Sequence, residues 1–75
     1  HMSTAPMTPK QATVYDSLRA FGYAYVSTDD DGVINMERRE ELAESSRVLH
    51  RVALYPDATT YEVTPAGKYN KVNFR

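Results

Sequence analysis

The stretch that decides the predicted fold is residues 61–75, which reads YEVTPAGKYNKVNFR. Aromatic and β-branched side chains on both sides of Pro65-Ala66-Gly67 are typical of two strands joined by a turn. The second run, residues 68–75, contains basic side chains and no acidic ones. We therefore expect a basic hairpin with strands over residues 59–64 and 69–74.

The segment before this hairpin has a helical pattern. Residues 36–55 place apolar side chains in a helical stripe between mixed charges, Asn35 is a suitable N-cap, and Pro56 ends the helix. Ser45-Ser46 interrupts the stripe. The segment is therefore either one helix of about five turns or a helix-turn-helix with residues 46–55 as the recognition helix.

A first helix is predicted near the N-terminus. Thr8 is a suitable N-cap, Pro9 occupies the first helical position, and Gln11 completes a capping box. Apolar residues then recur at spacings of three and four as far as Phe21, and Gly22 is a suitable C-cap.

A short hairpin is expected over residues 23–34, because Asp31-Gly32 is a strong turn signal. The three aspartates at 29–31 suggest a calcium loop, but an EF-hand aligned on the glycine places Ser27 at the first ligand position. It also places Arg38 at the last position, where a bidentate glutamate is required. We therefore predict a solvated acidic turn and no metal site.

A chain of 75 residues predicts one small domain. We assign residues 8–75 to a single α+β domain and residues 1–7 to a disordered tail, in which His1 is a vector scar before a native Met2. The chain has no cysteine, and no apolar run is long enough to span a membrane. These features favour a cytoplasmic protein.

The sequence offers little for catalysis. His50 is the only native histidine, and no nucleophile and acid are spaced to form a triad with it. The glycines are scattered and form no phosphate-binding loop. We predict a protein that is not an enzyme, with no catalytic residues and no cofactor.

Charge divides the chain into two parts. Residues 1–46 carry four basic and eight acidic side chains, whereas residues 47–75 carry five basic and two acidic ones. A basic end attracts nucleic acid or an acidic protein surface. On a helix, Arg47, His50 and Arg51 share one face, where they either reach DNA or form an ordinary charged surface.

The aromatic residues supply most of the large apolar groups. In a domain this small we expect most of the six tyrosines to lie in or beside the core. Tyr61 and Val63 are expected to face that core, with Tyr69 and Val72 as further candidates. An exposed edge at Tyr23 and Tyr25 would favour protein binding, and these two residues are the predicted protein interface.

Residues 60–68 are similar to the pattern Tyr-x-Leu-Thr-x-x-Gly-Lys/Arg at the wing of many bacterial and phage regulators. Residues 8–22 more loosely match the first helix of the same winged-helix domains. The resemblance implies a winged-helix-like α+β fold that binds duplex DNA. It implies that the DNA contacts are made by Arg47, His50, Arg51, Lys68 and Lys71.

Two functions follow as expectations. The first is a DNA-binding transcriptional regulator with its recognition helix in the major groove and its wing on the adjacent backbone. The alternative is a small phage-type protein that binds and inhibits or redirects a host protein such as RNA polymerase. The break at Ser45-Ser46 separates them, because without a turn between two helices a protein partner is favoured.

Overall fold

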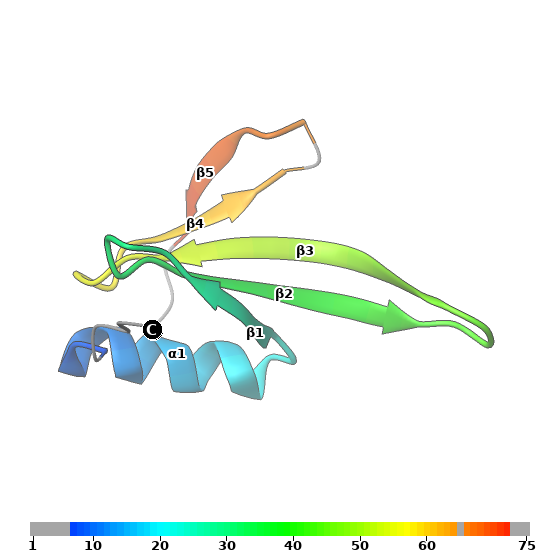
Figure 1. Cartoon of the computed structure of the whole chain (residues 1–75), viewed down its shortest axis with the longest axis horizontal. Helices are drawn as coiled ribbons and strands as arrows, with labels where there is room; N and C mark the ends of the chain where they lie inside the picture. The colour runs from blue at the N-terminus through cyan, green and yellow to red at the C-terminus, as the bar shows by residue number, and fades with distance from the viewer. Residues whose placement is uncertain (1–6, 65, 73–75) are drawn as a thin grey trace.

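The computed structural model describes residues 7–64 and 66–72, and it shows one helix followed by five strands (Figure 1). Residues 1–6 of the predicted tail lie outside the described residues. Residues 73–75, which include the end of the last predicted strand, also lie outside them. The elements are α1 (Pro9–Ala20), β1 (Ala24–Thr28), β2 (Ile34–Glu41), β3 (Ser46–Leu54), β4 (Thr60–Val63) and β5 (Tyr69–Val72).

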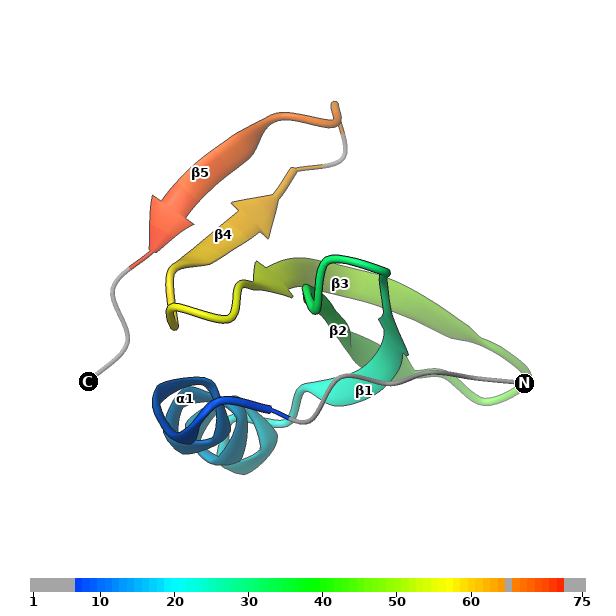
Figure 2. The ribbon, with the colours of Figure 1, turned by 60° about the vertical axis from the view of Figure 1, so that its left-hand side comes forward.

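The five strands form one antiparallel sheet in which spatial order follows chain order, β1-β2-β3-β4-β5. Helix α1 lies against one face of this sheet, beside β1 and the adjoining parts of β2 and β3 (Figures 1 and 2). Among the described residues, no helix or strand covers the opposite face, which we call the helix-free face.

The predicted start and end of α1 are confirmed. The Thr8 hydroxyl accepts a hydrogen bond from the backbone N–H of Gln11 at 3.1 Å, and the Gln11 side chain accepts one from the Thr8 N–H at 3.3 Å. Pro9 opens the helix. Gly22 follows the C-cap with φ of +93°, a left-handed conformation that favours glycine.

The core lies between α1 and the sheet. Leu18 of the helix is fully buried against four apolar side chains of β2 and β3. Gln11 is buried beside them, and its Nε2 donates to the carbonyl oxygens of Gly32 at 2.8 Å and Leu54 at 3.1 Å. One polar side chain therefore ties the first turn of α1 to the sheet. The four apolar strand residues are Ile34, Met36, Val52 and Leu54.

The predicted winged-helix-like fold is wrong. Residues 36–55 are not helical; they form most of β2 and β3, which make a long antiparallel hairpin. Ser45-Ser46 marks neither an uninterrupted helix nor a helix-turn-helix. Instead, Leu42 N–H donates to the Ser45 carbonyl oxygen at 2.8 Å across the turn of this hairpin, and Ser46 begins β3. The chain therefore has no recognition helix in this segment.

Burial explains why strands form here. Ile34 and Met36 are buried on β2 with Asn35 between them, so burial follows the two-residue period of a strand. The register places these side chains opposite Leu54 and Val52. Asn35, predicted to cap a helix, lies inside β2, and its Nδ2 donates to the Ser27 hydroxyl at 3.3 Å.

The hairpin predicted around Asp31-Gly32 is confirmed, with Gly32 at φ of +82°. The Asp29 carboxylate organises this turn by accepting from the N–H groups of Asp31 and Val33, each at 3.0 Å. A Cβ added at Gly32 would lie 3.3 Å from Pro56 Cγ. The β1–β2 turn therefore packs directly against the β3–β4 turn.

The C-terminal hairpin is also a hairpin in the structure, but of the four side chains predicted to face the core only Val72 lies on the helix-covered side, where it pairs with Thr60. Thr60 is 1% exposed on the helix-covered side, opposite Leu54. Tyr61 and Val63, which we expected in the core, alternate with it and lie on the helix-free face. Tyr69 shares that face, because it pairs with Val63.

The β2–β3 hairpin extends well beyond the rest of the sheet (Figure 1). Strand β1 pairs with β2 only up to Glu37, and β4 pairs with β3 only from Arg51 onward. Residues 38–50 therefore form a two-stranded ribbon, which we call the arm. Its pairing shifts at a β-bulge between Arg38 and Arg39.

Candidate functional site: a tyrosine pocket on the helix-free face

Three tyrosines from consecutive segments of the sheet meet on the helix-free face. Tyr55 follows β3, Tyr61 lies on β4, and Tyr69 begins β5. The ring centroids of Tyr55 and Tyr61 are 5.4 Å apart at 76°, and those of Tyr61 and Tyr69 are 6.3 Å apart at 73°. Together with Asp57 and Thr59 they line a cavity of about 240 Å³, which we call the tyrosine pocket.

Strand alternation and one tight turn build this pocket. Leu54 points into the core, so the next residue, Tyr55, projects to the other side. The chain then turns back, with Tyr55 N–H donating to Thr59 O at 2.8 Å and Ala58 N–H donating to Tyr55 O at 2.9 Å. Ala58 has φ of 73°, an uncommon conformation for a residue with a side chain. The turn thereby brings Tyr61 alongside Tyr55.

The pocket has an acidic wall. Asp57 accepts a hydrogen bond from the Thr59 N–H at 2.9 Å. Hydrogen bonds from the side chain and backbone of Thr59 lower the pKa of the Asp57 carboxyl below its ordinary value of 3.8, and the Lys71 ammonium lowers it further. The Asp57 side chain is therefore an anion at neutral pH.

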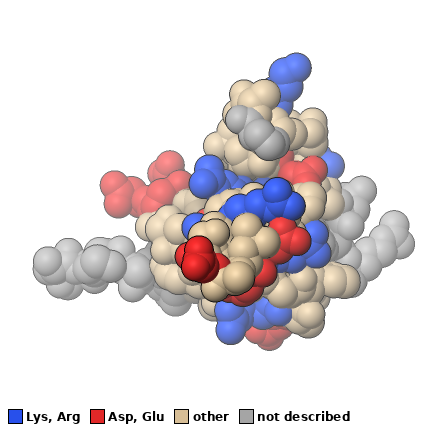
Figure 3. Space-filling model, turned by 90° about the vertical axis from the view of Figure 1, so that its right-hand side faces the viewer, with Lys and Arg blue, Asp and Glu red and all other residues tan. Residues whose placement is uncertain are grey.

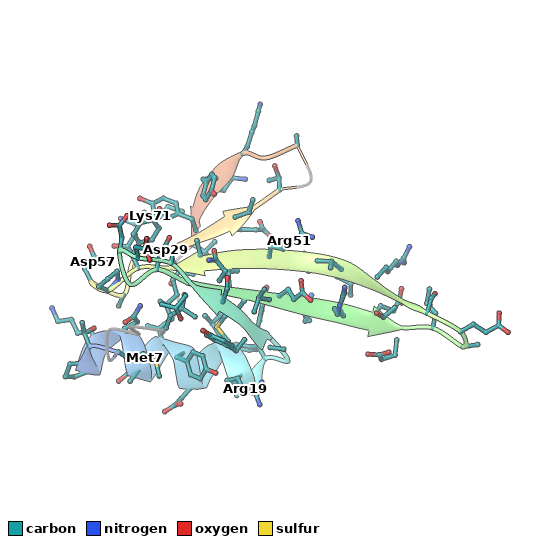
Figure 4. All side chains as sticks on the ribbon, viewed as in Figure 1. Met7, Arg19, Asp29, Arg51, Asp57 and Lys71 are labelled. Atoms are coloured by element: carbon teal, nitrogen blue, oxygen red, sulfur yellow. The ribbon has the colours of Figure 1, made fainter. Side chains whose placement is uncertain are left out.

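A second group of acids lies at the same end of the sheet. The turn that carries the aspartates at 29–31 contacts the turn that carries Asp57, through Gly32 and Pro56. Figure 4 labels Asp29, Asp57 and Lys71 at this end of the sheet, but Figure 2 shows the β1–β2 turn apart from the part of the β3–β4 turn that follows Pro56. Asp57 is therefore the acidic side chain that lines the tyrosine pocket, and Lys71 lies near it.

A shallow groove continues from the tyrosine pocket along the helix-free face. Tyr69 lines both spaces, and the groove has a volume of about 250 Å³. Its walls include the apolar side chains of Val26 and Val63. They also include Glu37 and Arg51, which face each other across β2 and β3. The two spaces have Tyr69 in common; the first is mainly aromatic and the second is mixed in polarity.

The predicted DNA-contacting residues of the helical region lie on strand β3, not on one helical face. Arg47 Nε is 2.7 Å from Glu40 Oε1, across the arm. His50 Nδ1 is 2.9 Å from Glu62 Oε2. Arg51 lines the groove on the helix-free face. The strand thus separates these three side chains and pairs two of them with glutamates.

The predicted basic contacts of the hairpin are also apart from one another. Lys68 is exposed in the β4–β5 turn, where its N–H donates to the Thr64 hydroxyl at 3.1 Å. Lys71 lies at the other end of β5, opposite Tyr61. On the face shown in Figure 3, basic and acidic side chains are interspersed. Lys68 and Lys71 are therefore separated along the hairpin, one in its turn and one opposite Tyr61.

The predicted protein-interface tyrosines lie away from the pocket. Tyr23 is half-buried and packs against the core, with the Arg38 guanidinium 5.7 Å from its ring centroid. Tyr25 is exposed on β1, opposite Met36, and its hydroxyl is 2.8 Å from that of Thr28. Both tyrosines therefore belong to the helix-covered side and its edge.

The described parts of the chain offer neither a metal site nor a second polar site. No group of three or more His, Asp or Glu side chains is placed to hold a metal ion there. The Nε of Arg38 is buried and has no hydrogen-bond partner among the described residues. The Arg38 guanidinium lies over the Tyr23 ring, and this cation–π contact accounts for the position of the side chain.

Sequence reasoning missed Tyr55, Asp57, Tyr61 and Tyr69 as a site because it counted the tyrosines as core. The alternation of Tyr61 and Val63 with Thr60 indicated two faces, but not which of them α1 would cover.

No helix in the described residues is long and apolar enough to cross a membrane. No protein-family model, curated protein or solved structure matches this chain.

Proposed function

We propose that this chain is a non-enzymatic binding module that docks a segment of a protein partner on the helix-free face of its sheet. The observation that carries the proposal is the tyrosine pocket and its continuation into the groove through Tyr69. Tyrosine is enriched in protein interfaces, because its ring offers a large apolar area and its hydroxyl forms hydrogen bonds.

The polarity of the groove supports a polypeptide partner. Val26 and Val63 offer apolar contacts, and Asn35 offers an amide beside them. The carboxylate of Glu37 is paired with Arg39 at 3.0 Å. Apolar patches bordered by paired charges and amides suit the alternating side chains and the backbone of an extended peptide.

Nucleic acid is a less suitable partner for this face. Its affinity depends on neutralising phosphates with lysine and arginine. Here the charged side chain that lines the aromatic pocket is Asp57, which is an anion at neutral pH. DNA binding by the predicted set stays a prediction, as does a phage-encoded role against a host protein; that set is Arg47, His50, Arg51, Lys68 and Lys71.

The test is selection of peptides from a random display library against the folded chain. We expect enriched peptides whose affinity falls at least about tenfold in Tyr69→Ser, because exposed aromatic anchors carry much of the free energy of binding. Tyr25→Ser is the matched control: it removes an exposed tyrosine at the edge of the helix-covered side and should leave affinity within about twofold.

Two results of the peptide selection would overturn the proposal: no peptide is enriched, or the enriched peptides bind Tyr69→Ser as well as the parent chain. A second experiment titrates duplex and single-stranded DNA at low and moderate salt. Binding that weakens steeply with salt, and that Lys68→Ala and Lys71→Ala abolish, would establish a nucleic-acid partner instead.

A further inference from the structure

We infer that the tyrosine pocket is an aromatic cage for an alkylammonium group, carried by a lysine or methylated lysine side chain of the partner. The identity of the carrier rests on the proposed function. The affinity of the pocket for a small cation does not, because it follows from the pocket itself. Three observations support it: the inclination of the rings, the size of the cavity and the sign of the surrounding charge.

The three tyrosine rings pack edge to face and are steeply inclined to one another. Tyr61 is inclined at 76° to Tyr55 and at 73° to Tyr69, so the three rings do not stack as parallel plates. A compact group held among inclined rings contacts several of them at once. Aromatic faces carry negative electrostatic potential, and quaternary ammonium groups bind among such rings.

The cavity matches one head group. Its volume is about 240 Å³, below the range of about 300–1,000 Å³ that is usual for drug-sized ligands. The groove that continues past Tyr69 leaves room for the chain that bears the head group. The pocket is therefore sized for the end of a side chain rather than for a whole metabolite.

The surrounding charge selects a cation. The Asp57 carboxylate lines the cavity and is an anion at neutral pH. It is the charged side chain among the residues that line the cavity. A phosphate or carboxylate ligand would meet this carboxylate without a dedicated basic partner in the cavity lining, whereas an ammonium group would be attracted by it.

Lys71 is a positive charge near the pocket. It lies opposite Tyr61 on β5, and its ammonium makes a minor contribution to the lowered pKa of Asp57, with no ion pair between the two side chains among those of the described residues. Removing this charge while keeping the length of the side chain, as in Lys71→Met, should make the pocket more favourable for an external cation. This substitution separates the two classes of ligand, because loss of a lysine weakens binding of nucleic acid.

The experiment compares choline with its neutral carbon analogue, 3,3-dimethylbutan-1-ol, at constant ionic strength. Binding is followed by the amide resonances of Thr59, Tyr61 and Tyr69 in the whole chain. We expect choline to bind at least about tenfold more tightly than the alcohol, since only the cation gains from the ring faces and Asp57. Asp57→Asn should remove most of this preference, because it retains the oxygen that accepts from Thr59 and loses the charge.

Lys71→Met should strengthen choline binding severalfold. The control is Tyr25→Leu, which removes a ring that lies outside the pocket and should leave choline binding unchanged. An amide spectrum like that of the parent chain shows that each variant is folded. Equal affinity for choline and the alcohol, or weaker choline binding in Lys71→Met, would overturn the inference.

The inference and the proposed function fail in different ways. If selected peptides require Tyr69 but choline and the alcohol bind alike, the docking face stands and the cation cage is wrong. If choline binds with the expected preference but no peptide is enriched, the cage stands and the protein-docking function is wrong.

Discussion

The two faces of the sheet use neighbouring residues for opposite purposes. On β4, Thr60 is almost completely buried against the helix-covered side, whereas Tyr61 beside it lines the tyrosine pocket. At the end of β3, Leu54 is fully buried, and Tyr55 after it projects to the helix-free face. A step of one residue along the chain is therefore enough to place the core and the tyrosine pocket on opposite sides of the sheet.

The largest expected effect comes from the helix-covered face. Leu54→Ala removes a fully buried side chain and should lower the free energy of unfolding by about 2–5 kcal/mol. That is a large part of the stability of a domain this small. Urea denaturation followed by circular dichroism measures the change.

The matched substitution on the helix-free face is Tyr69→Ser, at a residue that is 60% exposed. It should lower the free energy of unfolding by about 0.5–1.5 kcal/mol, because the edge contact of its ring with Tyr61 is lost. The contrast between the faces would be lost if the two substitutions cost the same.

An effect smaller than that of Leu54→Ala is expected at the polar link between helix and sheet. Gln11→Leu leaves the carbonyl oxygens of Gly32 and Leu54 without the donor that now reaches them. The expected cost is about 1–3 kcal/mol, because buried groups lose their hydrogen-bond partner. Thr13→Ala, at an exposed position of the same helix, is the control for thermal or urea unfolding. Equal stability of Gln11→Leu and the parent chain would show that helix α1 is held by apolar contacts alone.

The smallest effect concerns pH at the border of the helix-covered face. Burial raises the pKa of Tyr23 above its ordinary value of 10.0, with Arg38 opposing and Glu62 reinforcing the shift. The folded chain therefore holds this proton more tightly than the unfolded chain does. The resulting stability is complete below pH about 10 and is lost as pH rises through the folded-state pKa.

Tyr23→Phe keeps the ring beside Arg38 and removes the titrating hydroxyl. Its free energy of unfolding should fall less steeply above pH 10 than that of the parent chain, when urea midpoints are compared at several alkaline pH values. Parallel pH dependence in the two proteins would mean that Tyr23 does not titrate differently on folding.

The parts of the fold that sequence could predict are those set by local signals. Thr8, Gln11 and Gly22 define the ends of α1 through contacts within a few residues. Asp31-Gly32 likewise defines its turn through hydrogen bonds to Asp29. Both predictions are confirmed, because the residues that produce each structure are adjacent in the chain.

The β2–β3 hairpin was mistaken for helix because its strands are stabilised by distant partners. Ile34 pairs with Leu54, which is far along the chain, and their burial depends on Leu18 from α1. Glutamate and arginine favour helix in isolation, and apolar residues in a short segment match both periods. Tertiary burial decided between them.

The tyrosine pocket was out of reach for a related reason. Tyr55, Tyr61 and Tyr69 meet only because β3, β4 and β5 pair in one particular register. A shift of one residue would turn Tyr61 to the opposite face of the sheet. Composition reveals that the tyrosines exist, but only the register brings them together.

The arm has a consequence for how the chain behaves at high concentration. Among the described strands, the outer edges of its two strands pair with nothing, and open strand edges invite pairing with a second copy. Arg38, Arg39, Glu40 and Glu41 crowd one edge, and Arg47 lies on the other. Such charges oppose edge-to-edge aggregation. The charged residues of the arm, whose pattern predicted the exposed face of a helix, therefore oppose self-association at the open edges of its strands.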